Sequence, residues 1–177
     1  MTPGPCIVLV VAVLAALFAT AARADGIDPC SLLSEAELAE LGLPEDSVPS
    51  HESQPGAVQA CKYRFRTTGA ASDGTVSVIV SQGVPDRALQ LRGLQAKARE
   101  EGTPAQQQAR GEYFDGNVMC KVILASQQET SQCIGASEQS VVALSLSRPN
   151  LANQVTYPAS QLRITAALVS RVTSKGG

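Results

Sequence analysis

The residues best able to do chemistry in this chain are its cysteines and its single histidine. Five cysteines occur in 177 residues. Cys6 lies in an apolar leader, and Cys30, Cys61, Cys120 and Cys133 follow at wide spacings. A zinc site usually takes two ligands from a close pair such as C-x-x-C, and a nucleophilic thiol needs a neighbouring base. The wide spacings therefore favour two disulfide bonds over a metal site or a reactive thiol.

Four cysteines allow three pairings, and the sequence alone does not choose between them. We expect Cys30 to pair with Cys61 and Cys120 with Cys133, because these cysteines are neighbours along the chain. Each bond would close a loop of modest length, which stabilises a fold by roughly 3–4 kcal/mol in the chain-entropy model. Under this pairing Cys30 ties the start of the first helix to a strand.

The histidine and the carboxylates give no catalytic set. His51 lies in the polar stretch SVPSHESQPG, and neighbours within one loop do not form a triad, whose members converge from separate elements. We interpret His51 as a solvated loop histidine. The clustered carboxylates flank the first predicted helix, where negative charge is favoured by the dipole or simply solvated. These carboxylates are Glu35, Glu37, Glu40, Glu45 and Asp46. The sequence therefore predicts no catalytic residue, no metal site and no cofactor.

Two features are candidates for binding. Lys62, Arg64 and Arg66 alternate with apolar residues in CKYRFRTT, and three cations on one strand face could contact an acidic partner, an anionic lipid surface or a polymer. They could equally form an ordinary solvent face, or an edge strand kept charged against aggregation. Tyr113 and Phe114 in GEYFDGN form either an aromatic loop that contacts a ligand or a loop pinned to the core.

The composition narrows the class of partner. The formal net charge is −2 at pH 7, whereas binding nucleic acid requires a basic patch. The chain has no tryptophan and only 3% aromatic residues, so stacking platforms for bases or sugars are hard to build. Nucleic acid is therefore not an expected partner.

The start of the chain indicates export. Residues 7–22 are almost wholly apolar or small, but this run is shorter than the roughly 20 apolar residues of a membrane span. Ala22-Arg23-Ala24 supplies a small-x-small cleavage site. We expect residues 1–24 to be a cleaved signal peptide, with a retained anchor as the alternative. Residues 25–177 would then be one periplasmic or secreted domain with no transmembrane segment.

The elements that must position these residues follow from the hydrophobic period. Ser34 and Glu37 form a capping box at the start of a helix that Gly42 ends. Alternating apolar residues predict strands, and steps of three and four predict helices. The expected order after the first helix is a loop over 44–58, strands over 61–68 and 75–82, a helix over 85–102, a polar connector over 103–111, a strand over 117–126, a turn over 127–132 with a return at Cys133, a strand over 140–148 and a helix over 158–172.

This order predicts an α+β fold, with an antiparallel sheet of four to five strands and about three helices packed on it. The expected buried positions repeat every second residue in the strands and every third or fourth in the helices. They are Val76, Val78, Val80, Ala88, Leu91, Leu94, Ala98, Val142, Leu144, Leu146, Ile164, Leu168 and Val172.

The chain resembles a known family in one frame above all. Asp28-Pro29-Cys30-Ser31-Leu32-Leu33-Ser34-x-x-Glu37 is followed by Leu41-Gly42, by Cys61-Lys62-Tyr63, by a valine strand and by a second cysteine pair. Together these resemble exported bacterial domains of unknown function that are common among actinobacterial lipoproteins. The layout is similar to the extracellular sensor domain of a mycobacterial receptor kinase. The resemblance covers most of 27–172 and is sharpest over 28–43.

The resemblance implies a disulfide-stapled α+β domain with a groove between helix and sheet. It implies no catalytic residues, because the family pattern has none. Many of those proteins carry a lipidation cysteine at the end of the leader, whereas Cys6 precedes the apolar run. Membrane anchoring is therefore not implied.

These observations favour an exported, non-enzymatic binding module of the cell envelope. Its partner would be an envelope or extracellular protein, such as a toxin or enzyme that it inhibits, or a small ligand. The alternative is an envelope enzyme that uses Asp and Glu carboxylates or a carboxylate-bound metal. A third hypothesis is a purely structural envelope protein without a saturable ligand.

Export and disulfide formation can be tested by one mass measurement. Protein purified from its own host and sprayed without reductant should have the mass of a chain that starts at Asp25 and lacks four hydrogens. A full-length or fully reduced chain would contradict the export hypothesis. Extra mass in the native spectrum alone would be a carried ligand.

Overall fold

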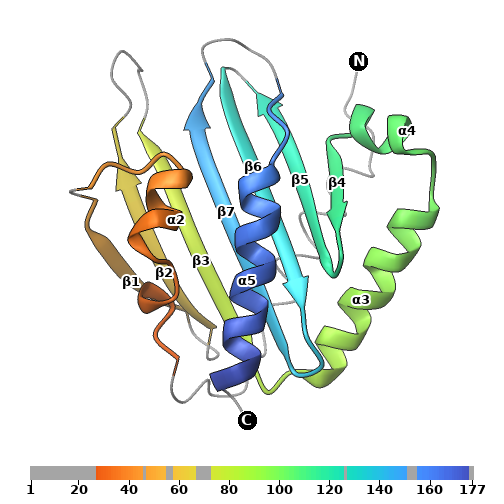
Figure 1. Ribbon diagram of the computed structural model, residues 1–177, viewed down its shortest axis with the longest axis horizontal. Helices are drawn as coiled ribbons and strands as arrows, with labels where there is room; N and C mark the ends of the chain where they lie inside the picture. Colours follow the sequence, from red (N-terminus) through yellow and green to blue (C-terminus); the bar gives the residue numbers. More distant parts are fainter. Residues whose placement is uncertain are drawn as a thin grey trace.

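The computed structural model describes residues 27–45, 47–54, 58–66, 73–125, 127–150 and 155–175. The predicted signal peptide and Asp46 lie outside these residues. Within them, seven strands form one antiparallel sheet in the order β1-β2-β3-β7-β6-β5-β4 (Figure 1). The strands are β1 (Pro49–Gln54), β2 (Val58–Phe65), β3 (Gly74–Gln82), β4 (Glu112–Asp115), β5 (Val118–Ala125), β6 (Gln128–Ala136) and β7 (Ser140–Pro149). β3 and β7 join strands β1–β3 to strands β4–β7.

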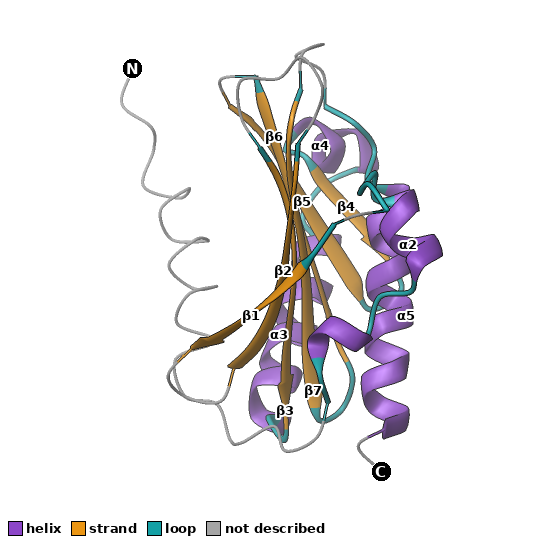
Figure 2. Cartoon of the chain, turned by 90° about the vertical axis from the view of Figure 1, so that its left-hand side faces the viewer, coloured by secondary structure: helices purple, strands orange, loops and turns teal. Residues whose placement is uncertain are grey.

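The described residues also form four α-helices and one short 3₁₀-helix. These are η1 (Pro29–Ser31), α2 (Glu35–Glu40), α3 (Pro85–Glu100), α4 (Pro104–Ala109) and α5 (Ala159–Lys175). Helices α2 and α5 lie on one side of the sheet, and α3 lies on the other (Figures 1 and 2). The predicted α+β class is confirmed, but the described residues form seven strands and four α-helices instead of the four to five strands and about three helices expected.

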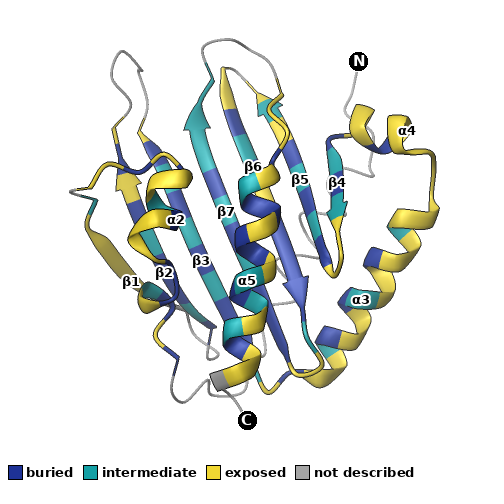
Figure 3. Cartoon of the chain, in the orientation of Figure 1, coloured by how far each residue is buried: buried dark blue, intermediate teal, exposed yellow. Residues whose placement is uncertain are grey.

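The core lies between the sheet and α5. Along the strands, buried and half-exposed residues alternate (Figure 3), as expected when side chains project to opposite faces. Three of the α5 residues predicted to be buried are fully enclosed. The buried residues on this side that the sequence predicted are Val76, Val78, Val80, Val142, Leu144, Leu146, Ile164, Leu168 and Val172.

Three polar segments were assigned wrongly from the sequence. The expected loop over 44–58 contains strand β1, whose residues pair with β2 in register although they lack apolar alternation. The expected connector over 103–111 contains α4, whose capping box joins Thr103 to Gln106. The aromatic stretch around Tyr113 is strand β4, paired with β5. Backbone pairing and helix capping can form strands and helices in segments that have no hydrophobic periodicity.

The expected turn over 127–132 is also wrong, because β6 already begins at Gln128. Its polar residues Glu129 and Ser131 occupy buried positions on the α5 side, in line with Cys133. The apolar-period rule misses a strand whose buried positions hold polar side chains, and Glu129 is tolerated there because its carboxylate is hydrogen-bonded.

Helix α3 packs on the opposite side of the sheet, at one end. Ala88 and Leu91 are buried against β6 and β7, as predicted. Leu94 is 44% exposed, and Gln95 takes the next buried position. The Gln95 side-chain amide donates to the carbonyl of Ile134 at 2.9 Å. The prediction that Leu94 is buried is wrong. Gln95 is buried in its place, which is possible because its amide is hydrogen-bonded.

Both expected disulfides form. Cys30 bonds to Cys61 and links η1 to β2. Cys120 bonds to Cys133, which lies directly opposite it in the β5–β6 register. The pairing expected from chain order is therefore the pairing observed, and two disulfides are typical of proteins from oxidising compartments.

A partly buried ion pair joins the start of α2 to the end of α5. Glu37 is 6% exposed and completes the predicted capping box with Ser34. Arg171 donates two hydrogen bonds of 2.8 Å to its carboxylate and a third to the carbonyl of Leu32. The hydrogen bonds from Arg171 lower the pKa of Glu37 from 4.5 to about 2, against the raising effect of burial.

Arg171→Met should destabilise the protein by roughly 2–3 kcal/mol at pH 7, because it leaves the Glu37 carboxylate buried without its cation. The pKa of Glu37 is depressed, so the pair stabilises fully above about pH 4.5 and progressively less as the pH falls toward 2. The loss caused by Arg171→Met should therefore be smaller at pH 3. Denaturant unfolding at both pH values measures this.

Arg163→Met is the matched control, since Arg163 pairs with Glu40 on the exposed side of the same helix. Exposed pairs contribute little, so this variant should lose less than about 1 kcal/mol at either pH. An equal loss for Arg171→Met at pH 7 and pH 3 would contradict the assigned role of the pair.

Candidate functional site

The candidate cations of β2 lie on the side of the sheet opposite α2 and α5, which we call the open face. The open face consists of the side chains that alternate with the core residues of β2, β3, β7, β6 and β5. Among the described helices, α3 is packed on it, against the end of β6 and β7. Figure 2 shows the sheet edge-on, with α2 and α5 gathered on the other side.

Two rows of side chains cross the open face from strand to strand. Adjacent side chains in a row belong to neighbouring strands, about 4.8 Å apart. Hydroxyl and amide groups fill the middle of each row, the first row has charged groups at both ends, and the second has Arg64 at one end and Ile123 at the other. One row is Lys62, Ser77, Ser145, Gln132, Lys121 and Glu112, and the other is Arg64, Thr75, Ser147, Thr130 and Ile123.

The hydroxyls in the second row are hydrogen-bonded to one another. Thr130 Oγ1 and Ser147 Oγ are 3.1 Å apart, and the Gln128 amide donates to the same serine at 3.0 Å. These bonds fix short side chains in place, so the centre of the open face presents oriented polar groups at low entropic cost.

The three predicted cations are not equivalent. The ammonium of Lys62 lies 3.4 Å from Glu52 on β1, and Arg66, just beyond the end of β2, lies 3.5 Å from Asp73. Arg64 is exposed and has no ion-pair partner among the described residues. Lys62 and Arg64 share the strand face and Arg66 lies beyond it, and among the described residues the Arg64 guanidinium is the one of the three without a carboxylate partner.

The edge-strand alternative for these cations is wrong, because β1 pairs outside β2. The edge of the sheet is β1, a short polar strand whose described side chains are exposed. Polar and charged side chains on an edge strand oppose edge-to-edge pairing with other molecules. Protection of this edge is therefore provided by β1. It does not explain why β2 carries Lys62 and Arg64.

Tyr113 and Phe114 point to opposite faces and do not form an aromatic loop. Tyr113 is buried on the α5 side, 5.2 Å from Tyr157 in an edge-to-face contact, and burial raises its pKa. Phe114 lies on the open face, with the guanidinium of Arg99 5.6 Å from its ring centre. One ligand could not contact both rings, so the pair predicted from GEYFDGN is divided by the sheet.

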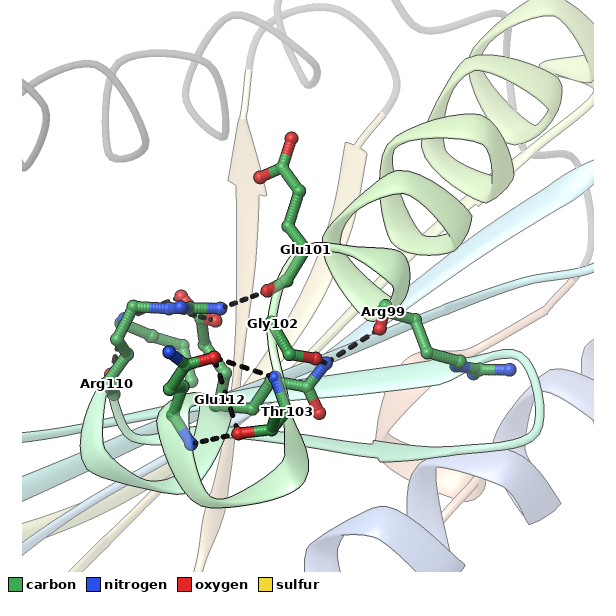
Figure 4. Close-up of polar contacts among 9 residues, drawn as sticks. Arg99, Glu101, Gly102, Thr103, Arg110 and Glu112 are labelled. Atoms are coloured by element: carbon green, nitrogen blue, oxygen red, sulfur yellow. Dashed lines mark hydrogen bonds and ion pairs between the residues drawn. The ribbon is translucent and has the colours of Figure 1, made fainter.

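A dense polar cluster joins α3, α4 and β4 (Figure 4). Arg110 donates to the carboxylate of Glu112 and to the carbonyl of Glu101, both at 2.8 Å. Lys121 donates to the second oxygen of Glu112 at 3.2 Å. These groups satisfy one another and fasten α4 to the short strand β4, so the cluster positions the margin of the open face.

The second buried carboxylate also has a positioning role. Glu129 is 3% exposed and accepts two hydrogen bonds from Arg148, one from the side chain of Asn150 and one from the backbone of Thr156. It therefore ties the end of β7 to the segment that leads into α5. Both buried carboxylates of the described residues, Glu37 and Glu129, are held by arginine, which leaves neither as a free acid or base.

The structure brings together one set of residues that the sequence kept apart. His51 lies on β1 directly opposite Cys61 on β2. Its Nδ1 is 3.6 Å from the sulfur of Cys30 and 3.6 Å from the carboxylate of Asp28. His51 is exposed, as predicted, but it lies on a strand beside a disulfide. Sequence reasoning missed this cluster because it did not predict β1. The pairing of β1 with β2 is what brings His51 next to the cysteines.

Comparison with protein-family models, with curated proteins and with solved structures finds no match to this chain. The resemblance to exported actinobacterial domains therefore stays a prediction. No helix of the described residues is long and apolar enough to cross a membrane.

The two disulfides should differ in their accessibility to reductant. Cys30 is partly exposed, whereas Cys120 and Cys133 are both buried beneath α5. A dithiol under native conditions should therefore reduce Cys30–Cys61 first. Timed alkylation followed by peptide mass spectrometry measures the order, and equal rates for the two bonds would show that reduction requires global unfolding.

Proposed function

We propose that this protein is an exported, non-enzymatic binding module that contacts a protein partner through the open face of its sheet. The observation that carries this proposal is the asymmetry of the sheet. Helices α2 and α5 cover one side, while the other side presents hydrogen-bonded hydroxyls around Arg64, which has no ion-pair partner in the part of the chain that the structure describes. The open face is therefore the side available to a partner.

The dimensions of the open face suit a protein partner. The five strands β2, β3, β7, β6 and β5 are 8 to 10 residues long. At about 4.8 Å between strands and about 3.3 Å per residue they span roughly 20 by 30 Å. One side of a standard protein interface buries about 800 Å², which is comparable in scale even with α3 over one end.

The distribution of charge also supports a protein interface. Charged side chains are depleted at interface centres and common at interface rims. The middle of the open face, on β3, β7 and β6, carries serine, threonine and glutamine, and the charges lie on β2, β4 and β5. Arg64 offers a planar fork of donors that matches a carboxylate. The proposed partner is thus a polar protein surface with an acidic side chain, such as that of an envelope enzyme or toxin held inactive.

No contact among the described residues favours the carboxylate-enzyme alternative. Of the carboxylates near α2 that suggested it, Glu37 is held by the capping box and Arg171, and Glu40 pairs with Arg163. A mutant series still separates the hypotheses, since an enzyme would lose all function with one carboxylate while keeping its fold.

Site-specific photo-crosslinking in the native host tests the proposed surface. A photoreactive residue at Gln132, which is exposed at the centre of the open face, should give a discrete protein adduct. The same residue at Ala166, exposed on the outer side of α5, is the control and should give none. Equal adducts from both positions, or none from Gln132, would contradict the proposal.

The role of Arg64 is tested in the same assay. Arg64→Glu should reduce the Gln132 adduct at least about fivefold, the scale of an interface residue that contributes ~1 kcal/mol, with an unchanged melting temperature. Arg163→Glu, a charge reversal on α5, should leave the adduct unchanged. If both reversals reduce it equally, the effect is general electrostatics and an acidic contact at Arg64 is excluded.

A further inference from the structure

We propose that reduction of the Cys30–Cys61 disulfide converts its surroundings into a zinc site whose ligands are Asp28, Cys30, His51 and Cys61. The site is independent of the open face, because these side chains lie on the other side of the sheet from Lys62 and Arg64.

The four side chains converge from three separate segments. Asp28 and Cys30 flank the start of η1, His51 lies on the edge strand β1, and Cys61 lies on β2. The Asp28, Cys30 and His51 ligand atoms all lie within 4.8 Å of one another. The Cys61 sulfur is bonded to that of Cys30, so it belongs to the same cluster. Carboxylate, imidazole and two sulfurs form a donor set that zinc takes in proteins.

The present distances already match a tetrahedral site. Zinc–sulfur bonds of about 2.3 Å and zinc–nitrogen or zinc–oxygen bonds of about 2.0–2.2 Å place the ligand atoms of a tetrahedron roughly 3.3–3.8 Å apart. His51 Nδ1 lies 3.6 Å from the Cys30 sulfur and 3.6 Å from the Asp28 carboxylate. Reduction separates the two sulfurs, which can then take up the spacing of two zinc ligands.

The surrounding contacts hold the ligands in place. The backbone N–H of Cys30 donates to the Asp28 carboxylate at 2.8 Å, and the Tyr63 hydroxyl donates to the Cys30 carbonyl at 3.1 Å. Pairing of β1 with β2 keeps His51 opposite Cys61. The side chains of His51 and Asp28 are 66% and 51% exposed, so an ion can enter from solvent without opening the core.

The chemistry is balanced by a dithiol reductant. The dithiol transfers two electrons and two protons to the Cys30–Cys61 bond, which gives two cysteine thiols and an oxidised cyclic disulfide. Zinc then binds the two sulfurs as thiolates, and the two protons pass to solvent. Disulfide and metal are alternatives at one place, and either one links η1 to β2.

The second disulfide lacks this environment. Cys120 and Cys133 are buried with Tyr113, Val118, Val122 and Leu162, and the single histidine of the chain lies at the other cluster. Reduction of that bond would expose thiols without nitrogen or carboxylate neighbours of this kind, so the proposal concerns one bond only.

Cobalt(II) is the probe, because it replaces zinc and reports its ligands by colour. The full protein is treated with dithiothreitol, which is removed without oxygen, and Co²⁺ is titrated in. The reduced protein should bind one equivalent, with a thiolate-to-cobalt charge-transfer band and the intense visible bands of tetrahedral Co²⁺, and Zn²⁺ should abolish both. The oxidised protein should show neither band.

Variants identify the ligands. Cys30→Ser should remove most of the charge-transfer band, and His51→Ala and Asp28→Ala should each weaken Co²⁺ binding at least about tenfold. Glu52→Ala is the matched control, since Glu52 is next to His51 but pairs with Lys62 on the open face; its binding should be unchanged. A reduced protein without the band, or equal affinity in His51→Ala and wild type, would overturn the proposal.

A second measurement applies if the reduced, metal-free protein unfolds. Zn²⁺ should then restore the far-ultraviolet circular dichroism and the thermal transition of the wild type, because binding energy becomes folding energy. It should fail to do so for His51→Ala. No recovery in the wild type, or equal recovery in both, would overturn the proposal.

Discussion

The two-residue period of the β-strand is the constraint on which the rest of this structure depends. On β2, β3 and β7 most of the larger apolar side chains lie on the face toward α2 and α5. β6 differs, because it places Glu129 and Ser131 on that face and Ile134 on the other. The apolar face has to be removed from water, and α2 and α5 do this. Among the described helices, α3 is the one that packs on the other face. The same period separates Tyr113 from Phe114 and directs Lys62 away from Cys61.

The sequence predicted well those elements whose apolar pattern matches their burial. The valines of β3, the alternating residues of β7 and the Ile164–Leu168–Val172 side of α5 are all buried as expected. It failed where order comes from the backbone. β1 has no apolar side, and α4 is six residues long. The capping box at Thr103 was nevertheless visible in the sequence, so α4 was predictable from a signal other than hydrophobicity.

The candidate sites were also predictable only where they depend on the apolar pattern of a single strand. Alternation predicted the direction of Lys62 and Arg64, but it could not predict that Glu52 and Asp73 would pair with Lys62 and Arg66. Those partners come from strand pairing and from a hairpin end, which are set by the assembled sheet. The cluster around His51 was beyond reach for the same reason, since it depends on β1. Cysteine pairing was accessible, because chain order alone favours short loops.

The order of the strands divides the protein into two meanders, β1–β3 and β4–β7, that meet at β3 and β7. Cys30–Cys61 joins η1 to β2 and Cys120–Cys133 joins β5 to β6, so neither disulfide crosses the line where the meanders join. Residues that pair there, such as Val76 and Leu146, are far apart in sequence, and contacts of this kind form slowly because a long loop must close first. Cys30 and Cys61 both precede Cys120 in the chain, so the first disulfide needs no residue of the second meander and the second needs no residue of the first.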